Sequence, residues 1–117
     1  MTKILVVDDD PSIRRMIVRI LGSTHDVLSA ETGREALELH KAHKPEIVVT
    51  DIIMPDMEGI ETIVELRNID PGLRIIAMSG APPIGKRSLL DFAKSLGADA
   101  VLKKPFRAAE LLALIET

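Results

Sequence analysis

Five short runs of apolar residues recur along the chain, and each stops at a polar or charged residue. β-Branched side chains dominate several runs, as in Ile47, Val48 and Val49. Such continuous apolar runs are typical of strands buried on both faces of a sheet. The runs therefore predict five strands, over residues 4–7, 27–30, 47–50, 73–78 and 100–102.

Between these runs, apolar residues recur at the three- and four-residue spacing of an amphipathic helix. Asp10 followed by Pro11 is a typical cap-and-proline opening for the first helix, and Gly22 ends it. The second helical pattern follows Gly33 and ends before Pro45. The predicted helices cover residues 11–21, 34–44, 59–70, 89–96 and 108–115.

The regular alternation of strand and helix predicts one class of fold. Short apolar strands separated by helices form a parallel sheet, because right-handed crossovers return each strand to the same sheet and place helices on both of its faces. We therefore expect an α/β fold with a single doubly wound, five-stranded parallel sheet. In such sheets the functional crevice lies outside the carboxyl ends of the strands.

The composition is that of an ordinary globular chain and argues against several classes of function. With 117 residues, 46% hydrophobic and 28% charged, the chain is expected to form one domain over residues 1–117. The net charge of −3 argues against nucleic acid as a direct partner, and without cysteine there is no disulfide or thiolate metal site. Neither a membrane span nor a signal peptide is indicated, so we expect a cytoplasmic protein.

Polar groups follow four of the strands and meet at the carboxyl edge of the predicted sheet. Each alone has an ordinary explanation as a helix cap, a turn residue or a solvated pair. Three converging carboxylates, however, repel one another by roughly 1 to 4 kcal/mol per pair at about 4 Å, and a divalent cation relieves that repulsion. An all-oxygen site suits Mg²⁺ (or Mn²⁺), and a lysine with a hydroxyl suits a phosphoryl group. The groups are Asp8, Asp9, Asp51, Ser79, Lys103 and Lys104.

The motifs VVDDD, DIIMPDMEG, AMSG and KKPF together resemble the receiver domain of two-component response regulators, over essentially the whole chain. The resemblance implies a flavodoxin-like (βα)5 fold with strand order 2-1-3-4-5. It also implies that Asp51 is the phosphoacceptor. Asp9 would be the main carboxylate ligand of Mg²⁺, with Asp8 beside it and the backbone carbonyl of Ile53 completing the protein ligands.

Two further groups take roles by the same resemblance. The hydroxyl of Ser79 would bind a phosphoryl oxygen, and Lys104, rather than Lys103, would pair with the phosphate. The peptide bond between Lys104 and Pro105 is usually cis in this family.

The function implied by the resemblance is a phosphorylation-dependent signalling switch that catalyses only its own phosphotransfer and autodephosphorylation. A sensor histidine kinase or histidine phosphotransfer domain would donate the phosphoryl group. A downstream protein would bind the surface formed by the helix over 89–96, the strand over 100–102 and the helix over 108–115. We expect a monomer or a weak phosphorylation-dependent dimer. A stand-alone receiver and a piece of a larger regulator or hybrid kinase both fit the sequence.

The chain departs from the family pattern in three places. Val101 stands where many receivers carry a switch tyrosine or phenylalanine, so a ring-flip readout is not expected. Extra length falls in the segment APPIGKRS, residues 81–88, which either reshapes the partner surface or is an inert loop. Ile53 and Ala81 occupy positions that tune dephosphorylation, and neither side chain bonds a water, so we expect a long-lived phosphoryl-Asp51.

Two rival functions share part of this pattern. A small phosphatase of the haloacid-dehalogenase type also uses a strand-end aspartate, Mg²⁺, a hydroxyl and a lysine, but it needs a second aspartate where this chain has Ile53. The other rival is a receiver-like module that binds its partner without phosphorylation.

We expect two polar clusters on the predicted helices to be mainly solvated faces. His40 and His43 have the spacing of a metal-binding pair, although such pairs are more often exposed. Arg14, Arg15 and Arg19 form a basic stretch on the first helix. In the family this helix often contacts the phosphotransfer domain of the kinase.

Overall fold

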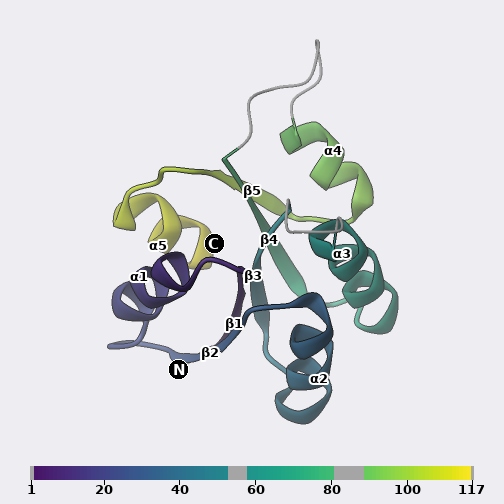
Figure 1. The fold of residues 1–117 in the computed structure, drawn as a ribbon, viewed down its shortest axis with the longest axis horizontal. Coiled ribbons are helices and arrows are strands. Elements are labelled where there is room, and N and C mark those ends of the chain that lie inside the picture. Colours follow the sequence, from purple (N-terminus) through teal and green to yellow (C-terminus); the bar gives the residue numbers. More distant parts are fainter. Residues whose placement is uncertain (1, 53–57, 81–88, 117) are drawn as a thin grey trace.

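The structure is a computed structural model that describes residues 2–52, 58–80 and 89–116. Strands and helices alternate along the chain, and the strands lie at its centre (Figure 1). The elements are β1 (Lys3–Val7), α1 (Pro11–Leu21), β2 (Asp26–Ala30), α2 (Gly33–His43), β3 (Ile47–Asp51), α3 (Glu58–Ile69), β4 (Arg74–Ser79), α4 (Leu89–Leu96), β5 (Ala100–Lys103) and α5 (Ala108–Glu116).

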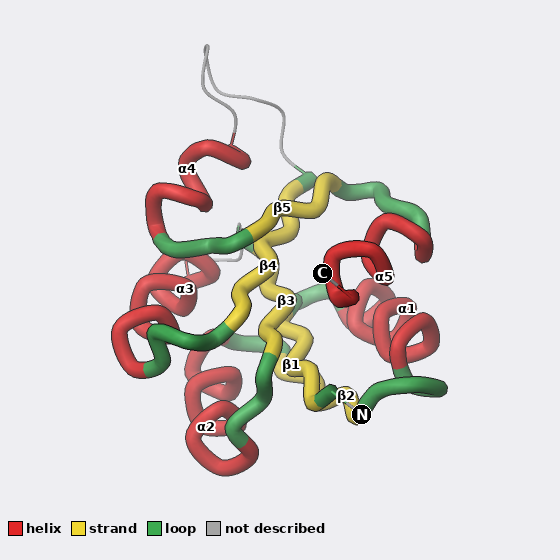
Figure 2. Tube along the Cα trace, turned by 180° about the vertical axis from the view of Figure 1, so that it is seen from behind, coloured by secondary structure: helices red, strands yellow, loops and turns green. Residues whose placement is uncertain are grey.

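The strands of the described chain form one parallel sheet in the order β2-β1-β3-β4-β5. Helices α1 and α5 cover one face of this sheet, and α2, α3 and α4 cover the other (Figures 1 and 2). The predicted doubly wound α/β fold and the strand order implied by the resemblance are therefore confirmed. From β1 the chain adds β2 on one side of the sheet and β3, β4 and β5 on the other, so the switch point lies between β1 and β3. In open α/β sheets, ligands bind at this switch point.

The central strands bury side chains on both faces, which explains why their sequences are continuously apolar. In β1, Leu5 and Val7 pack in the cluster that contains residues of α2, α3 and α4. Ile4 and Val6 pack in the cluster with residues of α1 and α5. Each such fully buried aliphatic side chain contributes about 1.5 to 3 kcal/mol to the burial free energy. The two clusters together hold β1 and β3 rigidly at the centre of the sheet.

Side-chain caps define where two helices begin. The carboxylate of Asp10 accepts a hydrogen bond from the backbone nitrogen of Ser12 at 2.9 Å, as the predicted cap of α1 requires. The hydroxyl of Thr32 accepts one from the nitrogen of Glu35 at 3.1 Å and caps α2. Both caps lie in the short loop that follows a strand, so they set the direction in which the chain leaves the carboxyl edge.

Gly59 lies within the first turn of α3, which begins one residue earlier than predicted, at Glu58. A Cβ atom at this position would overlap the backbone carbonyl oxygens of Asp51 and Ile52. Glycine is required here because the helix backbone packs directly against the end of β3. This close approach brings the start of α3 next to Asp51.

No helix in the described ranges combines the length and the apolar character needed to cross a membrane.

Candidate functional site

Three carboxylates meet at the carboxyl edge of the sheet, as predicted. Asp8 and Asp9 follow β1, and Asp51 ends β3, the strand that pairs with β1. Carboxylate oxygens of the three residues lie within 4.8 Å of one another. Asp8 is 1% exposed and Asp51 is 7% exposed, whereas Asp9 is exposed to solvent. The cluster therefore has a buried floor and an open side.

The buried Asp8 is held by four hydrogen bonds. Its backbone nitrogen donates to the carbonyl of Ala30 at 3.1 Å, which ties the end of β1 to the end of β2. Its carboxylate accepts from the backbone nitrogen of Asp10 at 2.9 Å and from the ammonium of Lys104 at 2.7 Å. Its carbonyl oxygen accepts from the guanidinium of Arg14 at 2.6 Å. The position of this carboxylate is thus fixed by the protein itself.

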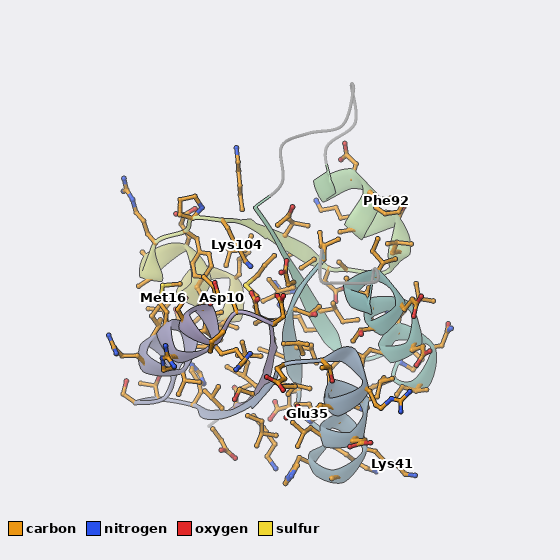
Figure 3. The ribbon with its side chains drawn as sticks, viewed as in Figure 1. Asp10, Met16, Glu35, Lys41, Phe92 and Lys104 are labelled. Carbon is orange, nitrogen blue, oxygen red and sulfur yellow. The ribbon has the colours of Figure 1, made fainter. Side chains whose placement is uncertain are left out.

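Lys104 brings a positive charge into the acidic cluster. Its Nζ atom lies 2.7 Å from Oδ2 of Asp8 and 3.4 Å from Oδ2 of Asp51. Its backbone nitrogen donates to the carbonyl of Ser79 at 2.8 Å, so the end of β5 is joined to the end of β4. Figure 3 shows Lys104 near the β1–α1 loop that carries Asp10. The neighbouring Lys103 is exposed, and Lys104 is the lysine that reaches the carboxylates.

The surroundings of Lys104 keep it charged. Burial by itself lowers the pKa of the ammonium, but the hydrogen bond to Asp8 and the negative charges of Asp51 and Asp8 outweigh burial. The net result is a pKa above the usual lysine value. One ammonium faces three carboxylates, so the cluster retains an excess of negative charge.

Ser79 ends β4 beside the cluster and is buried, with 6% of its surface exposed. On the adjacent strand Asp51 pairs with Met78, so Ser79 lies one residue beyond the level of Asp51. Its own neighbour on β5 is Lys103. The structure thus brings the ends of β1, β3, β4 and β5 to one edge.

The remaining predicted site residues have different settings. Val101 pairs with Ala77 and packs against the core cluster that α2, α3 and α4 cover. The Lys104–Pro105 peptide bond is cis, as the resemblance implies, and Pro105 is exposed. The expectations for Ile53, for Ala81 and for the extra length in residues 81–88 lie outside the described residues.

The solvated-face interpretation is wrong for Arg14. Its side chain is only 18% exposed, and the guanidinium bonds the carbonyl of Asp8. Arg15 and Arg19 are exposed, as expected. The available signal was position: Arg14 is in the first turn of α1, four residues after the cap Asp10, and a first-turn side chain can reach back to the preceding loop.

The same interpretation is wrong for His40. This residue is 8% exposed, and its Nε2 atom lies 2.9 Å from Oδ2 of Asp70, at the end of α3. The tie joins α2 to α3. His43 is exposed, and the carboxylate cluster that the described residues form includes neither histidine.

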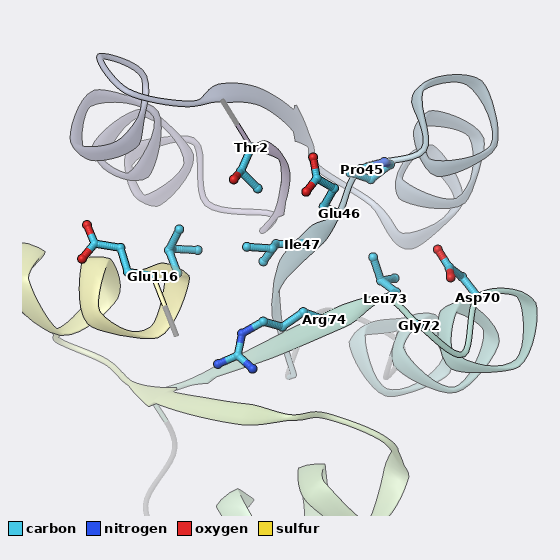
Figure 4. Close-up of a pocket in the computed structure, with 10 residues that line it drawn as sticks. Thr2, Pro45, Glu46, Ile47, Asp70, Gly72, Leu73, Arg74 and Glu116 are labelled. Carbon is cyan, nitrogen blue, oxygen red and sulfur yellow. The ribbon is translucent and has the colours of Figure 1, made fainter.

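A separate hollow of about 550 Å³ lies at the amino ends of β3 and β4, on the opposite edge of the sheet (Figure 4). Its lining includes Glu46 and Arg74. The guanidinium of Arg74 donates to the carbonyl of Leu114 at 3.2 and 3.3 Å, which ties β4 to the end of α5. None of the predicted site residues lines this hollow, so the candidate chemistry lies at the carboxyl edge.

The acidic cluster is chemically suited to a hard divalent cation. All of its side-chain donors are carboxylate oxygens, and they are close enough together to share one ion. The unbalanced negative charge supplies the attraction, and the exposed Asp9 leaves a route of entry. The donor set therefore fits Mg²⁺ or Mn²⁺.

Comparison with known sequences gives a consistent result. Residues 4–116 match the family described as response regulator receiver domain. The chemotaxis protein CheY of Bacillus subtilis is 39% identical over 115 residues, which cover 97% of this chain and 93% of that protein. The response regulator MprA of Mycolicibacterium vanbaalenii is 39% identical over 113 residues, which cover 95% of this chain but 47% of that protein.

Comparison with solved structures agrees. A response regulator receiver domain protein from Clostridium thermocellum superposes with a TM-score of 0.89 at 28% sequence identity, over 99% of this chain and 92% of that one. The chemotaxis protein CheY4 of Vibrio cholerae superposes with a TM-score of 0.87 at 29% identity.

Proposed function

We propose that phosphorylation of Asp51 switches this chain between two signalling states. The chain belongs to the response regulator receiver domains. It is therefore a module of two-component signalling rather than a true enzyme. The observation that carries the proposal is the placement of Asp51. It is a buried carboxylate at the end of a central strand, with an ammonium 3.4 Å away and further carboxylates within 4.8 Å. A strand that ends in buried, unbalanced negative charge is suited to binding a cation and a phosphoryl group.

The reaction is a phosphoryl transfer in which Asp51 is the nucleophile. A carboxylate oxygen of Asp51 attacks the phosphorus of a phosphohistidine on the kinase, and a new oxygen–phosphorus bond forms. The nitrogen–phosphorus bond of the donor breaks, and its electron pair returns to the imidazole nitrogen, which takes up a proton. The chain contributes mainly position and charge to this step, as proteins generally do in phosphoryl transfer.

We assign the metal site to Asp8, Asp9 and Asp51, with the carbonyl of Ile53 as a further ligand. Mg²⁺ (or Mn²⁺) bound there supplies positive charge that offsets the repulsion between carboxylates and phosphoryl oxygens. Asp8 and Asp9 differ in how the protein holds them, which favours different roles at the metal site. Asp8 is already fixed by Asp10 and Lys104, whereas Asp9 is exposed and accessible to an entering ion.

Lys104 and Ser79 are assigned to the phosphorylated state. A phosphoryl group on Asp51 adds nearly two negative charges at neutral pH, and Lys104 already lies 3.4 Å from that carboxylate. We infer that its ammonium pairs with the phosphoryl oxygens and that the hydroxyl of Ser79 donates to one of them. Both residues are at strand ends joined by the bond from the nitrogen of Lys104 to the carbonyl of Ser79.

The output surface is assigned to α4, β5 and α5. Lys104 directly follows β5, and Ser79 ends the neighbouring strand, so a movement of either reaches this part of the molecule first. With Val101 in place of an aromatic residue, we infer that the change is carried by repacking around β5. The partners are a histidine kinase or phosphotransfer domain and a downstream protein that binds this surface in the cytoplasm. We assign residues 1–117 to one receiver domain, monomeric or weakly dimeric when phosphorylated.

The test is the intact mass of the protein after incubation with Mg²⁺ and acetyl phosphate. We expect one added phosphoryl group, which disappears in Asp51→Asn and when EDTA removes the metal. Asp26→Asn is the matched control, because Asp26 is an exposed aspartate at the start of β2, at the other edge of the sheet. It should be modified like the wild type.

An unmodified wild type that nevertheless binds Mg²⁺ would contradict the proposal and favour the phosphorylation-independent module. Slow loss of the added mass over time would support the long-lived phosphoryl-Asp51. A decay rate that Ile53→Asn leaves unchanged would count against the role assigned to Ile53.

A further inference from the structure

Arg14 makes a contact that the phosphorylation chemistry does not require. Its Nη1 atom donates to the carbonyl oxygen of Asp8 at 2.6 Å, and its Nη2 atom lies 3.9 Å from Oε2 of Glu31. The guanidinium therefore spans the loop after β1 and the loop after β2. The Arg14 side chain is 18% exposed and that of Glu31 is 64% exposed. The hydrogen bond to Asp8 is therefore better shielded from solvent than the contact with Glu31.

The bonded carbonyl belongs to the peptide unit that joins Asp8 to Asp9. The orientation of a peptide unit fixes the position of the next Cα atom, because the unit is planar. The carboxylate of Asp8 is already held by Asp10 and Lys104. Asp9 is exposed, and its carboxylate makes no hydrogen bond or ion pair with another residue in the described ranges, so the backbone sets where it lies.

We propose that Arg14 is a positioning residue for the metal site, which holds the Asp8–Asp9 peptide so that the Asp9 carboxylate faces the ion. This inference rests on the proposed function, because it assumes that Asp9 binds the metal. Arg14 touches neither metal nor phosphoryl group in this role. It acts through the backbone, in the way that groups behind a metal ligand commonly orient it.

The charge of Arg14 and its hydrogen bond to Asp8 have opposite effects on metal affinity, which makes the proposal testable. A guanidinium near the cluster repels an entering cation, so removal of its charge alone would tighten metal binding. Loss of the hydrogen bond leaves the Asp8–Asp9 peptide less ordered and weakens binding. The proposal requires the second effect to exceed the first.

Arg15 provides the matched control. It is the next residue of the same helix, carries the same charge and is exposed. Substitution of either arginine by methionine changes the net charge equally and keeps a long side chain. The charge removed in Arg14→Met is nearer the cluster, so this variant binds more weakly than Arg15→Met only if loss of the contact with Asp8 exceeds the charge effect. Arg14→Lys is a third variant, which keeps the charge while replacing the planar fork of donors with a single ammonium.

The measurement is the Mg²⁺ dissociation constant by isothermal titration calorimetry, since the chain has no tryptophan or tyrosine to report by fluorescence. We expect Arg14→Met to weaken binding about tenfold relative to Arg15→Met, with Arg14→Lys between them. At saturating Mg²⁺, the rate of modification by acetyl phosphate should recover toward that of the wild type. Thermal unfolding in EDTA checks that each variant is folded before titration.

Equal dissociation constants for Arg14→Met and Arg15→Met would overturn the inference and leave the proposed function intact. Tighter binding by Arg14→Met would also overturn it, because the charge effect would then dominate. A wild type that does not bind Mg²⁺ at all would overturn both the inference and the proposed metal site. A rate that stays low at saturating Mg²⁺ would overturn the positioning role.

Discussion

Two clusters of charged residues lie at opposite edges of the same sheet and differ in how completely their charges are paired. At the carboxyl edge, one ammonium, on Lys104, faces the three carboxylates of Asp8, Asp9 and Asp51. At the amino edge, the guanidinium of Arg67 lies between the loop that leads into β4 and the loop that leads into β5. The charges at the carboxyl edge are balanced only when a cation binds, whereas those at the amino edge are already paired within the protein.

The amino-edge cluster uses every direction in which a guanidinium donates. Nε and Nη2 donate to the carbonyl of Gly97 at 3.0 and 2.7 Å. Nη1 donates to the carbonyls of Pro71 and Leu73 at 2.8 and 2.7 Å. Nη2 also donates to the carboxylate of Asp99 at 2.7 Å. One positive and one negative charge balance, and the loop carbonyls have their donors.

A charged cluster stabilises the fold or binds a ligand, depending on whether its charges are paired. Polar groups that are fully paired hold loops together, since breaking one pair leaves another group without a partner. An excess of like charge does the reverse, because it raises the energy of the empty site and makes the binding of an opposite charge favourable. Mutations in the amino-edge cluster around Arg67 should therefore change mainly the stability of the fold. Mutations in the acidic cluster around Asp51 should change mainly ligand binding.

The largest effect is expected from Arg67→Ala. This change removes the donors to three loop carbonyls and the partner of Asp99, so the free energy of unfolding should fall by about 2 to 3 kcal/mol. Urea unfolding followed by circular dichroism measures it. Arg19→Ala, an exposed arginine on α1, should change stability by less than about 0.5 kcal/mol. Similar values for both variants would remove the contrast between the two clusters.

Gly97→Ala should have the next largest effect. Gly97 has φ of 121°, where an L side chain is strained, and its Cβ would lie 3.1 Å from Cγ of Arg67. We expect a loss of about 1 to 3 kcal/mol in the free energy of unfolding. Gly72→Ala is the matched control, because its nearest atom, Oδ1 of Asp70, would be 3.9 Å away. If both alanines cost the same, the backbone at Gly97 is not special.

The smallest effect is expected from replacing one aspartate by asparagine in each cluster. It discriminates best, because the change in the free energy of unfolding should have opposite signs in the two clusters. In EDTA, Asp51→Asn should raise the free energy of unfolding by about 1 kcal/mol, since it relieves repulsion within the acidic cluster. Asp99→Asn should lower it by about 1 kcal/mol, since it removes the balancing charge beside Arg67.

Urea unfolding of both asparagine variants at low ionic strength measures the two signs. Addition of Mg²⁺ should then stabilise Asp99→Asn as it does the wild type, and stabilise Asp51→Asn much less. Destabilisation by Asp51→Asn in EDTA would show that its contact with Lys104 outweighs the repulsion.

Much of the fold and of the candidate site could be predicted from local patterns. Apolar runs separated by helical periodicity predict a parallel sheet, and the carboxyl ends of parallel strands share one edge. That rule places Asp8, Asp9 and Asp51 at the same edge, because each follows a strand within two residues or ends one. Recognition of the motifs then ordered the strands and assigned roles to the side chains.

Contacts between helices and loops could not be predicted in this way. His40 on α2 pairs with Asp70, which is 30 residues away, and Arg67 bonds Gly97 at the same separation. A polar residue on a predicted helix is expected to face solvent, and the pattern does not say which loop lies beside it. Arg14 differs from these two, because its partner Asp8 is only six residues away and its place in the first turn of α1 is a signal for that contact.

Hydrophobic periodicity and strand direction are local properties, so the strands, the helices and the edge at which the acids gather could be predicted from the sequence. Which charges are balanced depends on how the chain folds. Lys104 lies between Asp8 and Asp51 because β5, although the last strand along the chain, ends at the same edge as β1 and β3. Arg67 is satisfied because two loops present their carbonyls to it. Charge balance depends on distances through space, and those exist only once the chain has folded.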